Sequence, residues 1–465
     1  MNNHHIPFPT IINDSFTDNI FAHFDAILSD KKKDKFVLSV SGGSDSVLLL
    51  YLFCKYFESD KKRIIIAHVN HNIRRDSSID ENFVLMIGKK FNLKTYIKKL
   101  DPNTILKGDS IESWARRHRY DFLNTIMKKV GAKWVITGHH ANDQAETILM
   151  NISDKTGLFG LGGMKEINNN IIRPLLPYTK LQLNKVLRKY SIPFLEDSTN
   201  SNNYFKRNFI RNNIISPWLE QDSNLVESIT ATGRNFKDWQ DAMLYFINNF
   251  IDNNLIKNKK NNLLIDKNSF NKTPLFVRIC VLQVITNTIG SLRKPQVENL
   301  KGFLRKEAIG NKCYAINGFI ILNDRNSVII SKKKLRKSAP LELKIGCDHN
   351  FDNYIYKVTT YNKNAMFSSD SDDELIDLAA IKNKKLVLRY WSSGDRFKPL
   401  GMNGTQKISD YLINKKINLF EKDEQTVLTA DNQIIWVCGQ RIDDSAKISD
   451  HTKKIMRIRR RFKLA

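Results

Sequence analysis

Paired cysteines are missing from this chain of 465 residues. The five cysteines that it has stand far apart, and none belongs to a C-x-x-C pair: Cys54, Cys280, Cys313, Cys347 and Cys438. Disulfide frameworks and structural zinc or iron–sulfur sites need closely spaced sets of cysteines. The sequence therefore signals none of these three kinds of site.

Long apolar runs are missing as well. The N-terminus is polar and lacks the hydrophobic core of a secretion signal. No later run approaches the roughly 20 apolar residues that a membrane-spanning helix needs. We therefore expect a cytoplasmic protein with no membrane partner.

Acidic residues are scarce. The chain has 48 Asp and Glu against 74 Lys and Arg, which gives a formal net charge of +26. Such an excess favours a polyanionic partner, because Lys and Arg side chains displace counterions from a phosphate backbone. A general lysine bias is the alternative explanation, since Asn, Lys and Ile are all abundant here.

The N-terminal part of the chain alternates short β-branched runs with helical stretches. Residues 36–40, 64–69 and 134–137 are typical of buried strands, each followed by a loop and an amphipathic segment. This alternation predicts an α/β fold with a doubly wound parallel sheet. Such sheets bind ligands beyond the carboxyl ends of their strands, so the loops after these three runs are where chemistry is expected.

The length of the chain predicts two or three domains. We expect an α/β domain over residues 1–215, a mainly helical middle domain over 216–335 and a small α+β domain over 336–465. The basic stretch 332–337 is read as a boundary, with a solvated charge run as the alternative.

Several elements of the two later domains can be predicted. Residues 295–310 have the proline and glycine positions of a helix, and 314–322 with 327–331 form a hairpin. Residues 368–374 are acidic and rich in serine, which is typical of a loop. The last domain is expected to contain the following elements: a strand over 386–391, a helix over 408–417 and a hairpin over 426–437 that turns at Asp431 and Asn432.

A glycine- and serine-rich loop follows the first predicted strand: Ser41, Gly42, Gly43, Ser44, Asp45 and Ser46. Its glycines expose amide N–H groups, and the helix that follows adds a partial positive charge. The loop is therefore predicted to hold a pyrophosphate, with Mg²⁺ between Asp45 and the phosphates. It has neither the lysine of a Walker loop nor the spacing G-x-G-x-x-G. The alternative is a Gly/Ser turn that merely caps the helix.

This S-G-G-x-D-S pattern resembles the PP-loop ATP pyrophosphatases, which have a Rossmann-like fold. Seven further motifs narrow the resemblance to the tRNA(Ile)-lysidine synthetases: residues 67–74 (AHVNHNIR), 112–120 (ESWARRHRY), 138–147 (GHHANDQAET), 173–176 (RPLL), 196–200 (EDSTN), 207–211 (RNFIR) and 394–401 (GDRFKPLG). The resemblance covers both ends of the chain, and the residues between carry no matching motif.

The chain departs from the family pattern at two positions. Asn142 stands where the first aspartate of D-D-Q is expected, and Asn72 replaces a glycine. Because Asn142 carries no charge, metal binding in this motif is assigned to Asp143.

The resemblance implies a reaction with ATP, Mg²⁺, free L-lysine and an isoleucine tRNA with a CAU anticodon. ATP adenylates the C2 oxygen of the first anticodon cytidine, and the lysine ε-amine then displaces AMP to give lysidine. The amine must be neutral to attack, so a carboxylate or histidine that accepts its proton would help. A homodimer is left open.

The resemblance also implies a set of site residues. Catalytic roles are assigned to the following residues: Asp45, Asp143, Glu146, His140, Arg116 and Arg207. The nucleotide is assigned to residues 41–46 together with Ala67 and His68, and the metal to Asp45 and Asp143. Arg119 and Arg211 are further candidates for the charge of the leaving groups.

Each assignment has a structural alternative. Asp143 and Glu146 could form a capping box, the arginines could form structural ion pairs, and His140 could be structural. In the last domain, the basic residues 453–463 could bind tRNA phosphates or be a solvated tail. Asp395 and Arg396 could bind tRNA or pair with each other to shape a turn.

Three other functions compete. A cytidine thiolase would need cysteine pairs, and an amidotransferase-linked synthetase would need a glutaminase with a catalytic cysteine near the N-terminus; neither is present. An RNA-binding module that has kept a nucleotide-binding fold would bind ATP without turnover, and Asn142 keeps that alternative open.

Overall fold

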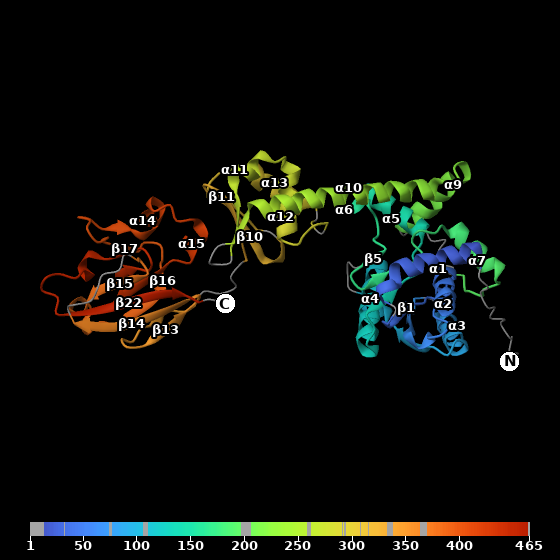
Figure 1. The fold of residues 1–465 in the computed structure, drawn as a ribbon, viewed down its shortest axis with the longest axis horizontal. Helices are drawn as coiled ribbons and strands as arrows, with labels where there is room; N and C mark the ends of the chain where they lie inside the picture. The colour runs from blue at the N-terminus through green and yellow to red at the C-terminus, as the bar shows by residue number, and fades with distance from the viewer. Residues whose placement is uncertain are drawn as a thin grey trace. The chain divides into compact units, whose positions relative to one another are not determined.

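The computed structural model describes most of the chain: residues 14–31, 33–73, 77–105, 110–196, 206–257, 262–290, 292, 294–306, 308–314, 316–332, 338–362 and 370–463. The chain divides into two compact units, 1–245 and 246–465, and each is described by itself (Figure 1). The division falls inside a helix, whereas our boundaries at 215 and 335 stay predictions. Residues 333–337, 368 and 369 lie outside the described residues, as do Arg74 and residues 197–200 of the motifs.

The first unit is built on a six-stranded sheet with the order β3-β2-β1-β4-β6-β5. The strands are β1 Phe36–Ser39, β2 Ile64–Asn70, β3 Lys94–Lys99, β4 Trp134–Ile136, β5 Ile167–Asn168 and β6 Ile171–Ile172. All neighbours pair in parallel except β5 with β6. The predicted doubly wound sheet is therefore confirmed, and its strand order reverses next to β1, where such sheets form a ligand crevice.

Helices cover both faces of this sheet (Figure 1). They include α1 Ser15–Leu28, α2 Ser44–Tyr56, α3 Ser77–Lys90, α4 Ile111–Val130, α5 Ala141–Ser153 and α7 Lys180–Lys189. Successive side chains of β1 point to opposite faces of the sheet, so each packs against the helices on its own face. Phe36 and Leu38 are buried in the same cluster as α1 and α2, whereas Val37 is buried in the cluster that contains Phe122 and Leu123 of α4.

The first unit continues through α6 Leu158–Leu161, α8 Lys206–Ile210, a π-helical turn Arg211–Ile215 and α9 Ser216–Gln221. The long helix α10 Leu225–Asn254 crosses the division between the units. α8 and the π-helical turn carry two arginines back to the first unit's site, as described below.

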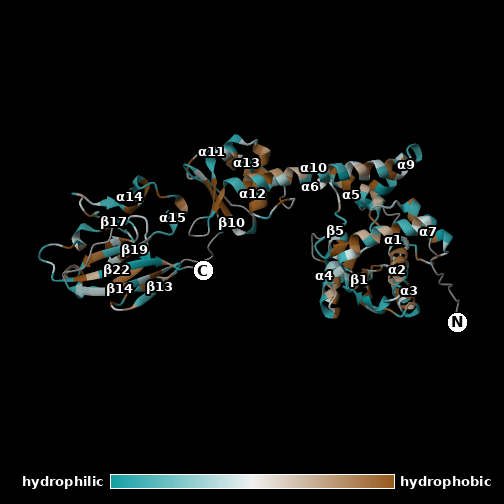
Figure 2. Cartoon of the chain, viewed as in Figure 1, coloured by the Kyte–Doolittle hydropathy of each residue, from teal (hydrophilic) through white to brown (hydrophobic). Residues whose placement is uncertain are grey.

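The second unit begins with a sheet in the order β7-β8-β11-β10-β9 and three helices. Their bounds are β7 Leu255–Lys257, β8 Leu263–Asp266, α11 Lys267–Lys272, α12 Leu275–Ile285, α13 Lys294–Arg305, β9 Lys312–Tyr314, β10 Phe319–Asn323 and β11 Ser327–Lys332. The predicted helix and hairpin are confirmed, although the hairpin strand starts at Phe319. β10 and β11 are mainly hydrophobic in Figure 2, as buried strands should be.

Two packed sheets form the C-terminal part. One has the order β12-β16-β19-β20-β21, with bounds Leu341–Glu342, Leu386–Tyr390, Thr426–Ala430, Gln433–Val437 and Arg441–Ile442. The other has the order β13-β14-β22-β15, with bounds Asp348–Phe351, Tyr354–Asn362, Lys454–Phe462 and Asp373–Asp377. Tyr356, Trp436 and Met456 share the core between them. Short elements complete this part: β17 Arg396–Phe397, β18 Gln406–Lys407, α14 Ile408–Asn414 and α15 Leu419–Asp423.

The predicted hairpin of the last domain is confirmed between β19 and β20. Asp431 and Asn432 both have positive φ, at 47° and 68°. Two consecutive residues of this kind form the turn whose twist suits a two-residue hairpin. Asn and Asp tolerate that conformation better than other non-glycine residues.

In the last domain the structure corrects the end of one predicted loop and excludes one structural alternative. The acidic stretch is not all loop, because Asp373 and Glu374 begin strand β15. The basic C-terminus is not a solvated tail, because residues 454–462 form β22, which lies between β14 and β15. Arg457 and Arg459 both donate to Asp373, at 2.6 to 2.9 Å, and Arg460 pairs with Asp372.

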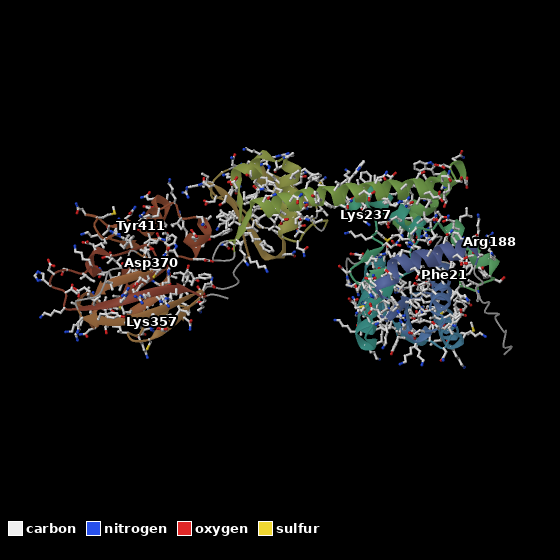
Figure 3. The ribbon with its side chains drawn as sticks, viewed as in Figure 1. Phe21, Arg188, Lys237, Lys357, Asp370 and Tyr411 are labelled. Carbon is white, nitrogen blue, oxygen red and sulfur yellow. The ribbon has the colours of Figure 1, made fainter. Side chains whose placement is uncertain are left out.

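Within the described residues, no helix is long and apolar enough to cross a membrane. Figure 3 shows nitrogen-tipped side chains over the surfaces of both units, among them Lys237 on α10 and Lys357 on β14. Cys54, Cys280, Cys313 and Cys438 are buried and Cys347 is exposed, and all five are free thiols.

Candidate active site

The glycine- and serine-rich loop lies between β1 and α2, at the carboxyl end of the sheet, as predicted. Gly42 has a φ of +100°, a conformation that side chains rarely adopt, so glycine is required there. Ser46 binds the loop together: its hydroxyl accepts from the Ser41 amide at 3.1 Å and donates to the Gly43 carbonyl at 2.9 Å. The loop is thus fixed by its own hydroxyls, with the start of α2 directly behind it.

Gly138, directly after the neighbouring strand β4, leaves room for the pyrophosphate loop to pack closely against it. A Cβ atom on Gly138, just after β4, would lie 3.1 Å from the carbonyl carbon and oxygen of Asp45 and 3.2 Å from the Ser46 nitrogen. These are backbone atoms that cannot move aside cheaply. The close approach of the β4 loop to the pyrophosphate loop therefore depends on Gly138, a role that sequence reasoning missed.

Two cavities open at this end of the sheet. The larger, of about 490 Å³, is lined by the end of β2, including His68 and Asn70, and by Glu112 and Arg119 of α4. The smaller, of about 180 Å³, is lined by the loop, including Gly43 and Asp45, and by His139. Ser39, Ser41 and Arg119 line both. The arrangement offers a larger chamber and, on the other side of these shared residues, a small one lined by the loop.

His68 lines the larger cavity, and its ring is buried in a fixed orientation. Its Nδ1 lies 2.8 Å from the Val40 carbonyl, which can only accept, so Nδ1 carries the proton. Nε2 is then an acceptor, and it has no partner among the described residues. Burial lowers the pKa of His68, which keeps the ring neutral. Ala67 is buried and lines neither cavity, and its carbonyl accepts from the Val40 amide at 3.1 Å as part of the pairing of β1 with β2.

The replacement of glycine by Asn72 has a local explanation. Asn72 has a φ of 54°, which lies in the left-handed region. After glycine, Asn is among the residues that adopt this conformation most readily. Its amide donates to the Asn70 side chain at 2.8 Å. The backbone turn that a glycine would make is therefore preserved.

Two carboxylates converge on His140. The Nε2 atom of His140 lies 3.5 Å from Asp45 Oδ2 and 3.5 Å from Asp143 Oδ2. Burial raises the pKa of Asp45, but His140 and Lys180 outweigh it and lower that pKa to about 2. Burial also opposes ionisation of Asp143, while His140 and Arg207 hold its pKa below the usual value. Both predicted metal ligands are thus charged and lie on one side of the loop.

Glu146 is only 1% exposed, and two arginines occupy its carboxylate. Arg211 Nε lies 2.5 Å from Oε1, and Arg207 Nε lies 2.6 Å from Oε2. Arg207 also donates to Asp143 Oδ1 at 2.9 Å. The two acidic side chains therefore hold both predicted arginines of residues 207–211 in one network.

The capping-box alternative has a different form from the one expected. α5 begins at Ala141, and Asp143 accepts from the His140 amide at 3.0 Å, so Asp143 is the third residue of the box and not its cap. Glu146 takes no part in it.

The arginines of α4 differ in position. Arg119 lines both cavities, and burial lowers its pKa. Arg116 is exposed, lies over the ring of Tyr120 at 5.1 Å and lines neither cavity. The structure therefore brings Arg119, rather than Arg116, to the loop.

Two residues to which sequence reasoning gave no role lie beside the loop. His139 lines the smaller cavity, Thr137 Oγ1 lies 2.8 Å from its Nδ1, and burial lowers its pKa to about 3 despite Asp143. Lys180, the first residue of α7, contacts Asp45 and donates to Ser44 Oγ at 2.7 Å. His139 could have been suspected as the neighbour of His140, whereas nothing in the sequence links residue 180 to residue 45.

In the second unit, Asp395 does not pair with Arg396 as the structural alternative had it. Both Asp395 oxygens accept from Arg389, at 2.8 and 3.0 Å, and Oδ2 also accepts from the Ser392 amide. Arg396 is exposed. Asp395 shapes the turn, and the Arg396 guanidinium lies at the surface.

Comparisons with known proteins agree with this geometry. Residues 16–217 match the family model of the PP-loop domain, and residues 386–459 match that of the TilS substrate C-terminal domain. The tRNA(Ile)-lysidine synthase of Clostridium tetani is 29% identical over 92% of this chain and 94% of its own, and that of Bacteroides thetaiotaomicron is 27% identical over 91% and 94%. The synthase of Thermosipho africanus is 41% identical over 41% of this chain and 45% of its own.

Proposed function

Since the chain belongs to the tRNA(Ile)-lysidine synthases of the PP-loop superfamily, we propose that it is an ATP-dependent ligase for the wobble cytidine of an isoleucine tRNA. It joins free L-lysine to C2 of that cytidine in the CAU anticodon and converts ATP to AMP and pyrophosphate. The product, lysidine, changes the codon read from AUG to AUA. A tRNA substrate places the protein in the cytoplasm.

The observation that carries this proposal is the pair of neighbouring cavities at the pyrophosphate loop, which share Ser39, Ser41 and Arg119. The loop amides and the start of α2 suit the β and γ phosphates, since both present positive partial charge. The larger cavity suits the nucleoside, because its volume of about 490 Å³ lies beside the loop and His68 and Asn70 line it. Arg119 lies where the two meet, next to the α phosphate of a nucleotide bound in this way.

The reaction has two balanced steps. The cytidine C2 oxygen attacks the α phosphorus, an O–P bond forms, and the bond to the pyrophosphate oxygen breaks. The neutral lysine amine then attacks C2, the C–O bond to AMP breaks, and the amine loses a proton. Arg119 and the loop amides stabilise charge on the departing groups.

Asp45 and Asp143 fit a magnesium ion. Asp45, in the first turn of α2, and Asp143, in the first turn of α5, each place one oxygen 3.5 Å from His140 Nε2, and carboxylate ligands suit Mg²⁺. Within the described residues no group of three His, Cys, Asp or Glu side chains could hold a metal, so phosphate oxygens and water would have to complete the coordination. Mg²⁺ would neutralise charge on the phosphates during adenylation.

We assign Glu146 a positioning role, since its two oxygens orient Arg207 and Arg211. Asp143 stays the candidate for metal or lysine contact, and such contact requires it to exchange a present partner, since its Oδ1 accepts from Arg207 and its Oδ2 from the His140 amide. His140 lies between the two aspartates, with its Nε2 3.5 Å from one oxygen of each, and we assign it the role of orienting them. Arg116 and Arg396 are left as candidates for tRNA phosphates, because both guanidinium groups are exposed.

The test is a reconstitution with purified protein. ATP, Mg²⁺, lysine and unmodified isoleucine tRNA with a CAU anticodon are incubated together, and the tRNA nucleosides are examined by mass spectrometry. We expect a cytidine that carries lysine, formed only with ATP present. Cleavage of ATP without modified cytidine would point to another PP-loop substrate, and ATP binding without cleavage would point to an RNA-binding module.

A further inference from the structure

The pyrophosphate loop has no lysine of its own, yet the fold brings one to it. Lys180 is the first residue of α7, 135 positions beyond Asp45 in the chain. Its ammonium donates to Ser44 Oγ at 2.7 Å and contacts Asp45 Oδ1. Lys180 therefore reaches two consecutive residues of the loop that is proposed to hold the phosphates.

The backbone of Lys180 is fixed by the residue at which this chain departs from its family. Asn142 Oδ1 accepts from the Lys180 amide at 2.8 Å. Beside it, the Ala141 amide donates to the Tyr178 carbonyl at 2.8 Å. These two bonds tie the start of α5 to the start of α7, so the root of the lysine side chain is held while its end remains about one-third exposed.

An ammonium in this place does more than balance Asp45. His140 lies 3.5 Å from the other Asp45 oxygen, so the carboxylate already has a second partner. A lysine that reaches a phosphate loop is a point charge suited to β and γ phosphates, and it is the group that a Walker loop carries in its own sequence.

We propose that Lys180 is the phosphate-binding lysine of this loop and that Asn142 is its positioning residue. Without nucleotide, the ammonium rests on Asp45 and Ser44. With nucleotide bound, it moves to the terminal phosphates, and Asp45 becomes available as a metal ligand. This inference rests on the proposed binding of ATP at residues 41–46.

The test is calorimetric titration of the full chain with three probes in the presence of Mg²⁺: ATP, inorganic pyrophosphate and AMP. Lys180→Met should weaken ATP and pyrophosphate binding roughly tenfold or more, because it removes a charged donor from phosphate oxygens. AMP, which lacks the terminal phosphates, should bind within about twofold of the unchanged chain. Lys180→Arg should keep part of the affinity, since it keeps the charge.

A matched control is available on the same helix. Lys185 is exposed on α7, and Lys185→Met removes the same charge from the unit without touching the loop. If Lys180→Met and Lys185→Met bind ATP equally well, the proposal is wrong. If Lys180→Met weakens the binding of AMP and the binding of ATP to the same extent, the lysine is structural and the proposal is also wrong.

The positioning role of Asn142 has its own pair of variants. Asn142→Ala removes the acceptor of the Lys180 amide and should weaken ATP binding but not AMP binding. Asn142→Asp keeps an acceptor oxygen and should restore most of the affinity. This pair keeps the proposal testable if Lys180→Met fails to fold, and equal ATP affinity of the two Asn142 variants would overturn the positioning role.

Failure of the proposed function gives a different result. If the unchanged chain binds neither ATP nor pyrophosphate, residues 41–46 are not a phosphate site and the proposed function falls first. If the unchanged chain binds both and Lys180→Met is unaffected, only the inference about Lys180 falls.

Discussion

At the scale of single residues, Asp45 combines three properties that usually conflict. It is partly buried, it is ionised, and it lies on a loop that is proposed to receive an anion. His140 and Lys180 resolve the conflict by placing donors at both carboxylate oxygens. A carboxylate that stays charged beside phosphates is useful only if a cation accompanies the nucleotide, which supports the placement of the metal.

Asp45→Asn should therefore reduce adenylation by roughly 100-fold or more, because it removes a charged metal ligand from the transition state. Affinity for tRNA should stay nearly unchanged. ATP cleavage in the presence of tRNA is the measurement for the first effect, and filter binding for the second. Asp238→Asn, at an exposed position of α10, is the matched control. Full turnover of Asp45→Asn would place the metal elsewhere.

Glu146 is the residue whose loss should cost the most stability. Glu146→Gln removes the buried charge that Arg207 and Arg211 share. It leaves Asp143 as their counter-charge, so the cost should lie below the roughly 3–5 kcal/mol of a fully broken buried pair. Thermal unfolding followed by circular dichroism should show a clearly lower midpoint. The exposed Glu220→Gln of α9 should leave the midpoint where it was. Equal midpoints for the two variants would mean that the arginine network adds little.

His139 should make stability depend on pH. Its folded-state pKa of about 3 lies below the ordinary 6.5, so the unfolded chain binds the extra proton first as pH falls. Stability is then lost between about pH 6.5 and pH 3, by about 1–2 kcal/mol from pH 7 to pH 5. Denaturant unfolding at these two pH values should show a smaller difference for His139→Gln. An unchanged difference would mean that other groups cause the pH dependence.

At the scale of elements, the site depends on how closely loops from different strands approach. The β4 loop touches the backbone of the pyrophosphate loop through Gly138, and the starts of α5 and α7 are tied together beside them. The ends of the strands position the loops of the site, and the first residues of the helices supply its hydrogen-bond donors. Local geometry of this kind tolerates little added volume.

Gly138→Ala should separate the two loops, because its Cβ would lie 3.1 Å from backbone atoms of Asp45. We expect ATP affinity to fall roughly tenfold or more, since a misplacement of this size at a phosphate site is costly. Gly157→Ala is the control, as a Cβ there meets nothing within 4 Å and its φ is −70°. Calorimetric titration with ATP compares the two, and equal affinities would show that the loops can relax.

At the scale of the whole molecule, the net charge of +26 is not one basic surface. Asp372 and Asp373 form ion pairs with three arginines of β22, and Glu146 forms ion pairs with Arg207 and Arg211. The charge available to a polyanion is therefore what remains on exposed lysines and arginines of both units (Figure 3). That remainder is still large.

Binding of tRNA should accordingly be steeply salt-dependent. We expect the affinity to fall by at least about tenfold between about 50 mM and 200 mM salt, because phosphate contacts release counterions. Filter binding over that range measures the slope. Arg461→Ala, next to the paired arginines of β22, should lower the slope only if this strand touches the tRNA, whereas a flat profile would contradict a phosphate-backbone interface altogether.

The sequence by itself determined the features that depend on near neighbours. The buried runs of the first sheet, the loop at residues 41–46 and the hairpin turn at Asp431 and Asn432 all follow from spacing and from residues that tolerate particular backbone angles. The family motifs located the catalytic domain in the same way.

Only the tertiary structure decided which charged side chains meet. It paired Lys180 with Asp45, Glu146 with two arginines and Asp395 with Arg389, and it turned a supposedly solvated tail into the strand β22. Chain topology sets the partners of Asp45 and Glu146 across 61 to 135 residues, and even Arg389 and Asp395 are six apart, whereas sequence patterns report interactions over a few residues. For that reason the place of the site could be predicted, and the partners that tune it could not.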